Sequence, residues 1–478
     1  MRAVFTKSQI KTIDKMAADY LQINSFELMQ QAGAAIFSYV HNEKNLLVVT
    51  GAGNNAGDGF VMAQLALQRG IKVVVWGLLS IEKLPKDARH AADSYIKSGG
   101  QIIDVQPKHK FDCVVDAIFG TGLSRNVEGV FAQAVEWINQ QKAKVVSVDI
   151  PSGLDADTGC IMACSVAADM TVCVIAFKPG LLTNHGKDIC GQLYLEDLEI
   201  PNQLLCEFSS QINELDVSVL QQDLFQHVHN SHKGSFGHAL IVGGHDGMLG
   251  ALMLAGRAAL RSGCGMVETV TNGEQSVLIS LQCPELITTN DVKASRLISS
   301  TQVIAIGPGL GLNQESKTVL DYCIKQNKPM VVDADALTLS ANVHVFSNDV
   351  VLTPHPKEAG TLLDCDVAVI QNDRVSAAIA IAQKYQAVVV LKGSGTVVAN
   401  PEGKVAICPY GYSGMATAGM GDVLTGIVAG LMAQGFDAFN AAQTAVVWHA
   451  LAAEDCHKGN GLIASDVIEQ LPQTLIKR

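Results

Sequence analysis

The sequence predicts an α/β protein built from two domains, and three observations support this prediction. The chain has 478 residues, which exceeds the ~100–200 residues of an ordinary domain. Short apolar runs rich in β-branched residues alternate with longer amphipathic stretches along most of the chain. The alternation occurs in two series whose glycine and aspartate motifs differ. We therefore expect two unrelated domains, at residues 1–215 and 222–478, with the boundary near Leu220.

The composition is that of a folded protein. Hydrophobic residues make up 48% of the chain and charged residues 17%, which is too apolar for a disordered chain. No apolar run approaches the ~18 residues that a membrane-spanning helix needs. The opening segment is charged throughout and lacks the apolar core of a secretory signal. We expect a soluble, cytoplasmic protein without membrane association, in which most of the twelve cysteines are small buried hydrophobic residues.

The charge balance limits the class of partner. The chain carries 34 Lys and Arg against 46 Asp and Glu, a formal net charge of −12, and contains no run of basic residues. Binding to a phosphate backbone requires a basic face, so nucleic acid is not an expected partner. An anionic small molecule would have to be held by backbone N–H groups, helix N-termini or bound cations. We expect small-molecule substrates and a homo-oligomer.

The first domain is predicted to contain a parallel sheet. Its apolar runs are hydrophobic on both faces and are separated by amphipathic stretches, which is typical of strands covered by helices on both sides. The runs are, in order, NLLVVT (45–50), IKVVVWGL (71–78), CVVDAIFG (113–120), KVVSVDI (144–150), TVCVIAF (171–177) and QLYLEDLEIP (192–201). Helices are expected at FVMAQLALQRG (60–70), KDARHAADSYIKSGG (86–100) and GVFAQAVEWINQQ (129–141). The polar segment 202–232 is predicted to be a connector.

A glycine-rich turn follows the first of these strands. GAGNNAGDG, from Gly51 to Gly59, leads directly into a helix. Its glycines and asparagines allow positive φ angles and close backbone approach, and the free N–H groups of the helix point at whatever binds there. The segment favours an anion or a nucleotide phosphate. A simple tight turn is the alternative, because one glycine-rich turn is weak evidence.

Two later strands end in aspartate, Asp116 and Asp149, and Lys178 follows another strand. The carboxyl ends of parallel strands form the ligand crevice of an open sheet, so these residues should meet there. A single aspartate at a strand end is often only a helix cap, but three charged groups together indicate a site. Asp116 with oxygens of Asn55 and Ser152 would suit an alkali or alkaline-earth ion.

The motifs LMQQAG, GAGNNAGDG, DAIFGTGLSRN, VDIPSGLDADTG and FKPGLLT together resemble the N-terminal epimerase domain of the bifunctional NAD(P)H-hydrate repair enzymes. The resemblance implies a Rossmann-like three-layer α/β/α fold and a potassium ion held by Asn55, Asp116 and Ser152. Asp149 or Lys178 would be the catalytic residues that move a proton. By this resemblance, hydrated NADH or NADPH contacts Asn54, Asn55, Ala56, Gly57, Asp58, Gly120, Thr121, Gly122, Leu123, Ser124, Arg125, Asn126 and Asp149.

The second domain is predicted from a second series of apolar runs. These are HALIVGG (238–244), VIAIGPGLG (303–311), PMVVDADAL (329–337), VVLTPHPKEAG (350–360) and AVVVLKGSGTVVAN (387–400). Helices are expected from Gly250 to Gly263 and from Ala416 onward. We expect a second α/β domain whose strands end in loops suited to ligands.

The candidate site of this domain is GMATAGMGDVLTG, from Gly414 to Gly426. Successive N–H groups at such a helix start form an anion hole. Asp422 at its edge suggests a base that deprotonates a substrate hydroxyl attacking phosphorus; a helix cap is the structural alternative. KGSGT after a strand suits nucleotide phosphates, with a hairpin turn as the alternative. His355, between two prolines, is the histidine we expect to contact substrate.

The segments HKGSFGHALIVGG, MLGALMLAGRAALRSGCGMV, DADAL, TPHPKEAG, LKGSGT and ATAGMGDVLTG resemble the ribokinase-like superfamily, and within it the ADP-dependent NAD(P)H-hydrate dehydratases. This resemblance implies a ribokinase-like α/β fold with ADP as phosphoryl donor and Mg²⁺ as cofactor. It implies that Ala251, Gly309, His355 and Asp422 line the hydrate. It also implies that ADP or AMP is bound by Lys392, Gly393, Ser394, Gly395, Thr396 and Gly421.

The implied chemistry is the repair of hydrated nicotinamide rings. Hydroxide is a poor leaving group, but phosphorylation by ADP converts it to phosphate, which the ring nitrogen lone pair can expel. Asp422 would take the hydroxyl proton, and the amides of Ala418 to Gly421 would hold the developing charge. The epimerase would supply the competent S epimer. Two alternatives remain at this stage: a vitamin-precursor kinase in the second domain and a non-catalytic nucleotide-binding module in the first.

Overall fold

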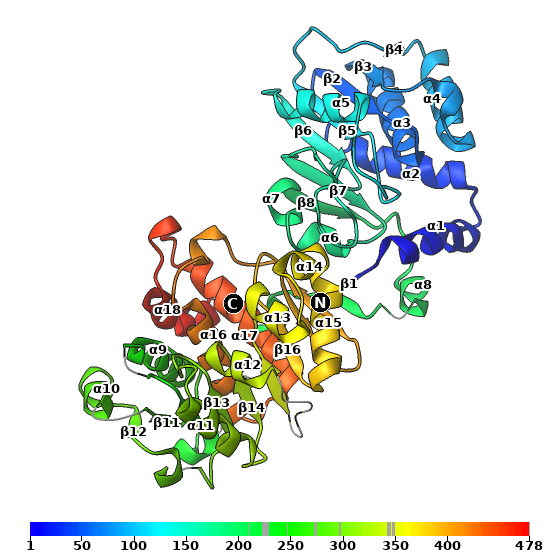
Figure 1. Cartoon of the computed structure of the whole chain (residues 1–478). Coiled ribbons are helices and arrows are strands. Elements are labelled where there is room, and N and C mark those ends of the chain that lie inside the picture. The colour runs from blue at the N-terminus through cyan, green and yellow to red at the C-terminus, as the bar shows by residue number, and fades with distance from the viewer. Residues whose placement is uncertain are drawn as a thin grey trace. The chain divides into compact units, whose positions relative to one another are not determined.

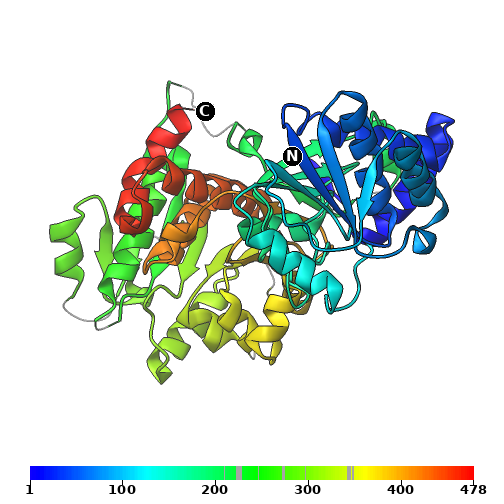
Figure 2. The ribbon, with the colours of Figure 1, turned by 90° about the horizontal axis from the view of Figure 1, so that it is seen from above.

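The computed structural model describes residues 1–208, 210–221, 229–245, 247–271, 275–295, 298–341, 346 and 349–477. The chain divides into two compact units (Figure 1). The N-terminal unit is Ala3–Ile212, and the C-terminal unit is Asn213–Arg478 together with Met1–Arg2. Within each unit, a sheet runs between layers of helices, as Figure 2 shows from above. The α/β class predicted from the sequence is confirmed.

The sheet of the N-terminal unit has the strand order β4-β3-β2-β5-β6-β7-β8, and every neighbouring pair is parallel. The apolar runs found in the sequence form these strands. Because all strands are parallel, their carboxyl ends lie along one edge. The strands are β2 (Asn45–Thr50), β3 (Lys72–Gly77), β4 (Gln101–Ile103), β5 (Cys113–Ala117), β6 (Lys144–Val148), β7 (Met170–Val174) and β8 (Gln192–Glu196).

Alternate residues of one strand supply two different cores. Leu46 and Val48 join the core that includes residues of the helices α2, α3 and α4, whereas Leu47 and Val49 join the core beneath α5. This alternation follows from the two-residue period of a strand, and it produces the expected three layers. The helices are α1 (Lys7–Leu21), α2 (Ser25–Phe37), α3 (Asn54–Gln68), α4 (Lys86–Lys97), α5 (Val130–Asn139), α6 (Pro179–Leu182), α7 (Gly186–Ile189) and α8 (Asn202–Glu207), with η1 (Ile81–Lys83).

The sheet of the C-terminal unit is mixed. Its order from one edge to the other is β1-β9-β18-β17-β16-β15-β14-β13-β10-β11-β12. The edge strand β1 is Arg2–Val4, and its first residue belongs to this unit. The pairs from β16 to β12 are parallel, but β16, β17 and β18 form antiparallel pairs. The strands are β9 (Ile212–Glu214), β10 (His238–Val242), β11 (Met266–Val270), β12 (Ile287–Thr289), β13 (Val303–Ile306), β14 (Met330–Val332), β15 (Val350–Leu352), β16 (Val388–Leu391), β17 (Thr396–Ala399) and β18 (Val405–Cys408).

The predicted connector 202–232 contains more structure than its composition suggests. Its described residues include α8, the sheet strand β9 and the 3₁₀ helix η2 (Val217–Leu220). Residues 209 and 222–228 lie outside them. A three-residue strand such as β9 carries too few side chains to show an alternating pattern, so its sheet partner determines its conformation.

Helix α16 is almost entirely buried. All but two of its fourteen residues are buried, and at Gly426 an added Cβ atom would lie 2.1 Å from the carbonyl oxygen of Ala255, so the two helices approach closely. Within the described ranges, no helix is both long and apolar enough to span a membrane. The helices are α9 (Leu249–Arg261), α10 (Ser276–Gln282), α11 (Gln314–Ile324), α12 (Asp335–Ser340), α13 (Pro356–Leu363), α14 (Val367–Asn372), α15 (Arg374–Tyr385), α16 (Met420–Ala433), α17 (Ala438–Asp455) and α18 (Ala464–Ile476), with η3 (Lys233–Phe236), η5 (Val292–Ala294), η6 (Ser413–Met415) and η7 (Gly459–Gly461).

Candidate active sites

The first candidate site lies where the strand order of the N-terminal sheet reverses. From β2 the chain continues to β3 and β4 on one side, and it then returns to β5, β6 and β7 on the other. The helices that follow β2 and β5 therefore cover opposite faces of the sheet, and their preceding loops start side by side. Open parallel sheets bind ligands in the crevice between such loops. The glycine-rich segment 51–59 follows β2, and residues 120–126 follow β5. The structure thus brings together the two loops that the sequence singled out.

Asp116 is the fully buried carboxylate of this site. It accepts hydrogen bonds from Ser147 Oγ at 2.8 Å, from Ser152 N at 2.8 Å and from Ser152 Oγ at 2.5 Å. Burial raises its pKa, and the bonds from Ser152 and Ser147 oppose this effect. These donors are neutral, so an adjacent cation would stabilise the ionised carboxylate.

The other two predicted potassium ligands lie beside Asp116. The Asn55 side-chain amide donates to the carbonyl of Phe119 at 3.0 Å, and the Phe119 amide donates to Ser152 Oγ at 2.8 Å. Asn55 Oδ1 faces Gly120, where an added Cβ atom would lie 3.3 Å from it. Asn55 and Ser152 therefore both contact Phe119, and Ser152 also contacts Asp116. Neutral and anionic oxygens are the ligands that a hard cation prefers. They fit potassium.

Lys178 and Asp149 form a buried ion pair. Lys178 is fully buried, and its ammonium also donates to the carbonyl of Val174 at 3.0 Å and contacts Cys173 Sγ at 3.2 Å. Burial by itself would lower the pKa of Lys178, but the Asp149 carboxylate outweighs this effect and the pKa is raised. Lys178 is therefore a charged group at neutral pH rather than a base. Asp149 has a φ of +66°, in the left-handed region.

Two further carboxyl groups interact with this pair. Burial, Asp149 and Asp14 raise the pKa of Asp58 well above its ordinary value. The Asp14 side chain on α1 reaches solvent, and the surrounding protein partly desolvates its carboxyl group. This desolvation and the nearby Asp149 carboxylate raise the pKa of Asp14 to about 6, whereas Lys178 opposes the shift. Sequence reasoning predicted Asp58 as a substrate contact and missed Asp14. The sequence does place Asp14 beside the apolar residues Ile10 and Ile13 of an amphipathic helix, and this position indicates a partly buried carboxyl group.

The remaining predicted epimerase residues differ in exposure. Asn54 is exposed, whereas Ala56 and Gly57 are buried at the start of α3. An added Cβ atom at Gly57 would lie 2.4 Å from Met29 Sδ and 3.0 Å from the Ala88 Cα, so α2 and α4 both pack closely here. Leu123 belongs to the core beneath α5, so its side chain serves packing. Its neighbours Gly122, Ser124, Arg125 and Asn126 are exposed, and Gly120 and Thr121 are half-buried.

The second candidate site gathers groups from β14, β16 and α16. Lys392, directly after β16, donates to Asp333 Oδ1 at 2.9 Å and lies 3.8 Å from Glu358 Oε2. Asp333 Oδ2 accepts a hydrogen bond of 2.8 Å from Thr425 on α16. An added Cβ atom at Gly421 would lie 3.2 Å from Lys392 Nζ. The predicted nucleotide residues Lys392 and Gly421 are therefore neighbours, and Asp333 connects them.

Asp422 occupies the first turn of α16. Burial and the nearby Asp333 and Asp335 carboxylates raise its pKa to about 7, against an opposing effect of Lys392. A carboxylate with this pKa can accept a proton near neutral pH. The helix N-cap is Gly419, with φ +89° and no side-chain cap. The first N–H groups of α16 are therefore not capped by a side chain at this position and favour an anion.

His355, the histidine expected to contact substrate, also caps a helix. It is the N-cap of α13, and its Nδ1 accepts hydrogen bonds from the amides of Lys357 at 3.1 Å and Glu358 at 3.2 Å. The capping role is thus present in the structure. Because Nδ1 accepts, the neutral ring carries its proton on Nε2, and the side chain remains 48% exposed. Nε2 lies 3.4 Å from Glu358 Oε1, so the exposed edge of the ring is shared with this carboxylate.

The KGSGT segment is the turn of an antiparallel hairpin between β16 and β17. Gly393 has a φ of +147°, and an added Cβ atom there would lie 2.7 Å from Arg374 Nη2. Arg374 is 2% exposed and donates to the carbonyl of Leu391 at 3.2 Å and to Gln371 Oε1 at 2.9 Å. The hairpin alternative is therefore correct as local structure. Arg374, which the sequence analysis did not identify, packs against Gly393 and stabilises this turn.

Gly309 and Ala251, two predicted hydrate contacts, both adjoin Met248. An added Cβ atom at Gly309 would lie 2.7 Å from Met248 Cβ, and the amide of Ala251 donates to the carbonyl of Met248 at 3.2 Å. His449 on α17 was not anticipated. It is 7% exposed, and its Nε2 has no hydrogen-bond partner among the described residues. Burial, assisted by Lys392, lowers its pKa to about 4, so it is neutral at physiological pH.

Comparisons with known proteins match both halves of the chain. The NAD(P)H-hydrate dehydratase family model matches residues 239–474, and the model of the YjeF-related protein N-terminus matches residues 25–180. The chain is 37% identical to the bifunctional NAD(P)H-hydrate repair enzyme of Escherichia coli, over 98% of this chain and 93% of that protein. It is 36% identical to the enzyme of the same name from Vibrio cholerae, over 98% of each chain.

A solved structure resembles the C-terminal part. The chain is similar to a ribokinase-like superfamily protein from Enterococcus faecalis, with a TM-score of 0.52 and 26% identity over 56% of this chain and 96% of that chain. This likeness agrees with the ribokinase-like fold expected for the C-terminal unit. Since the curated relatives match over nearly their whole length, the family is defined by both halves: the chain belongs to the bifunctional NAD(P)H-hydrate repair enzymes.

Proposed function

We propose that this chain restores hydrated NADH and NADPH in two steps. The N-terminal unit interconverts the R and S hydrates as an isomerase. The C-terminal unit acts as a lyase that dehydrates the S hydrate with ADP and releases AMP and phosphate. The observation that carries the proposal is full-length similarity to enzymes bearing this name, with both family models matched in order.

The dehydratase mechanism rests on Asp422 and the start of α16. Asp422 takes the proton of the substrate hydroxyl as its oxygen attacks the β-phosphorus of ADP, and AMP leaves. The amides of Ala418 to Gly421 hold the charge on the transferred group. The ring nitrogen lone pair then expels phosphate, which regenerates the intact ring. Lys392, fixed by Asp333 at 2.9 Å, supplies positive charge beside the nucleotide phosphates, with the other KGSGT residues donating amides.

Mg²⁺ and potassium suit the two sites by their donor chemistry. In the C-terminal site the carboxylates of Asp333, Glu358 and Asp422 outnumber the single Lys392. A divalent cation held by Glu358 together with the phosphates would restore the charge balance and stabilise the transferred phosphoryl group, and it would leave Asp422 free to act as the base. In the N-terminal site, Asn55, Asp116 and Ser152 would hold potassium and position the dinucleotide phosphates. A cytoplasmic location and a homo-oligomeric state stay predictions from the sequence.

The decisive experiment supplies hydrated NADH to the purified chain and follows the absorbance of the reduced nicotinamide. Full recovery from a mixture of epimers with ADP, accompanied by AMP and phosphate, is expected. Recovery of only the S fraction beyond the spontaneous rate would remove the epimerase from the proposal. A stable phosphorylated product would instead favour the kinase alternative. Parallel reactions with ATP and without nucleotide test the nucleotide requirement.

A further inference from the structure

The first turn of α1 is anchored to the segment that carries Lys178. Val4 forms a parallel β-bridge with Phe177, and the amide of Phe5 donates to the carbonyl of Phe177 at 2.9 Å. Phe177 directly precedes Lys178, so the chain enters α1 beside the buried lysine. Thr6 then caps the helix through a capping box with Gln9.

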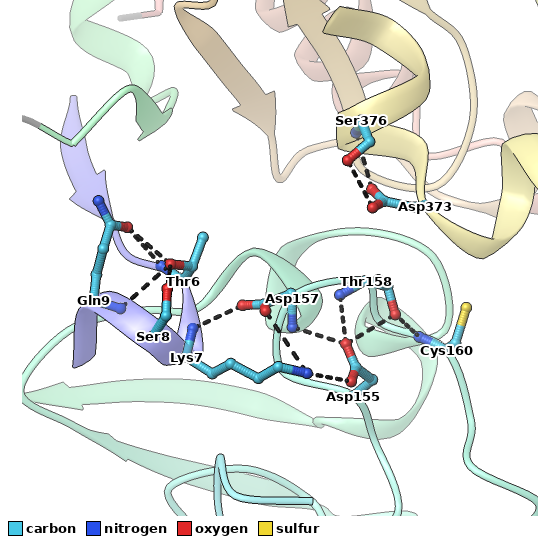
Figure 3. Close-up of polar contacts among 10 residues, drawn as sticks. All are labelled: Thr6, Lys7, Ser8, Gln9, Asp155, Asp157, Thr158, Cys160, Asp373 and Ser376. Atoms are coloured by element: carbon cyan, nitrogen blue, oxygen red, sulfur yellow. Dashed lines mark hydrogen bonds and ion pairs between the residues drawn. The ribbon is translucent and has the colours of Figure 1, made fainter. Parts of the chain in front are cut away.

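A second anchor fixes α1 to the loop that follows Asp149, as Figure 3 shows. The amide of Lys7 donates to Asp157 Oδ1 at 2.7 Å, and its ammonium donates to Asp155 Oδ2 at 3.1 Å. Asp155 Oδ1 also accepts from the amides of Asp157 and Thr158, both at 3.0 Å, which makes the loop rigid. Helix α1 is thus held by both segments that supply the ion pair.

Asp14 lies on the same side of α1 as Lys7, which contacts the loop after Asp149. It follows Lys7 by seven residues, which is about two helical turns, so the two residues share one side of the helix. Ile10, Ile13 and Ala17 surround this position and are buried in a cluster with Ile175 and Ala176, between β7 and Lys178. In the described part of the chain, the Asp14 carboxylate forms no hydrogen bond, and it is open to solvent. It is placed where a substrate can reach it.

We propose that Asp14 is a third ionisable group of the epimerase site, which accepts and returns the proton that inversion of the hydroxyl-bearing carbon requires. This inference rests on the proposed epimerase function. In the ring-opening route, the carboxylate takes the hydroxyl proton, C=O forms, the ring C–N bond breaks and the nitrogen gains a proton. Closure on the opposite face reverses each transfer, so no proton or electron is gained or lost. Loss and return of water also needs a group that gives and retakes one proton.

The neighbouring groups are poorly suited to this role. Lys178 is fully buried and ion-paired, so its proton is held firmly, and Asp149 is engaged with it. The groups that face Asp14 are Asp149 after β6, Lys178 after β7 and Asp58 on α3; the raised pKa of Asp14, about 6, places both of its protonation states within reach near neutral pH. On α1 itself, Lys11 and Lys15 are exposed.

The test measures exchange between the R and S hydrates by the full chain, without ADP, from pH 5 to pH 8. For Asp14→Asn we expect kcat to fall by about 10²–10⁴-fold with little change in KM, and the limb of the pH profile near pH 6 to disappear. Asp14→Glu should restore part of the rate. Asp19→Asn, an exposed residue of the same helix, is the matched control and should behave as the wild type. Dehydration of pure S hydrate should be unchanged in all three variants.

Two results would overturn the inference. The first is a wild-type kcat and pH profile in Asp14→Asn. The second is a rate that falls only in proportion to a lower melting temperature and is not restored by Asp14→Glu, since this marks a structural role. If the wild-type chain itself does not accelerate exchange, the proposed epimerase function fails instead, and this outcome is distinct from both.

Discussion

Replacing Asp422 should make the C-terminal unit more stable while removing its activity. The Asp422 carboxyl is half-buried beside two other carboxylates, which raises its pKa from 3.8 to about 7. The ionised group therefore costs the folded state free energy at alkaline pH. Asp422→Asn keeps the shape of the side chain and removes its charge. Since the proposed base is lost, the rate of dehydration should fall by about 10²–10⁴-fold.

The magnitude follows from linkage between proton binding and folding. A pKa of about 7 instead of 3.8 corresponds to at most about 4 kcal/mol, at ~1.4 kcal/mol per pKa unit. Solvent screening of a partly exposed group reduces this, so we expect about 1–3 kcal/mol. The folded protein keeps the Asp422 proton up to about pH 7, whereas the unfolded chain releases it near pH 4. Stability is therefore lost as the pH rises through this interval. The gain from Asp422→Asn is largest at pH 8 and shrinks towards pH 5.

The assay is thermal or urea unfolding of the nucleotide-free chain at pH 8 and pH 5. At ~2–4 °C per kcal/mol, the C-terminal transition of the variant should rise by several degrees at pH 8. Asp366→Asn is the matched control, because Asp366 is an exposed N-cap whose side chain makes no capping bond. An Asp422→Asn variant that is equally or less stable than the wild type at pH 8 would refute the reasoning. So would a stability gain that does not depend on pH.

Three further predictions test other parts of the two sites. Asp149→Asn should abolish exchange between epimers and leave dehydration of the S hydrate intact; loss of both activities would contradict separate sites. Gly393→Ala should raise KM for ADP, because its Cβ would lie 2.7 Å from Arg374 Nη2, whereas Gly403→Ala, at a positive φ in open space, should not. Replacing potassium by sodium should slow epimerisation and lower the melting temperature of the N-terminal unit, and Asp116→Asn should remove this salt dependence; identical melting of the wild type in both salts would count against the ion.

Much of the fold and both site locations could be predicted because strand ends determine them. Apolar runs identify the parallel strands, and in such a sheet every residue that follows a strand lies at the same edge. This geometry brings Asp116, Asp149 and Lys178 together in the N-terminal unit. It also brings Lys392 to the strand-end region of β14, where Asp333 lies. The exceptions are the antiparallel strands β17 and β18, whose sequences are as apolar as those of the parallel strands. Strand direction leaves no mark on a buried strand of four residues.

The residues that sequence reasoning missed are those whose role depends on a partner distant in the chain. Asp14 occurs in a helix with ordinary amphipathic spacing, and its proposed place in the site depends on the pairing of Val4 with Phe177 and on the bond of Lys7 to the loop after Asp149. Arg374 likewise supports a turn that begins eighteen residues later. A local motif predicts which backbone segment a ligand contacts. It does not predict the side chains, distant in the sequence, that hold that segment in place. These supporting residues are therefore where mutation and pH profiles add most to the sequence.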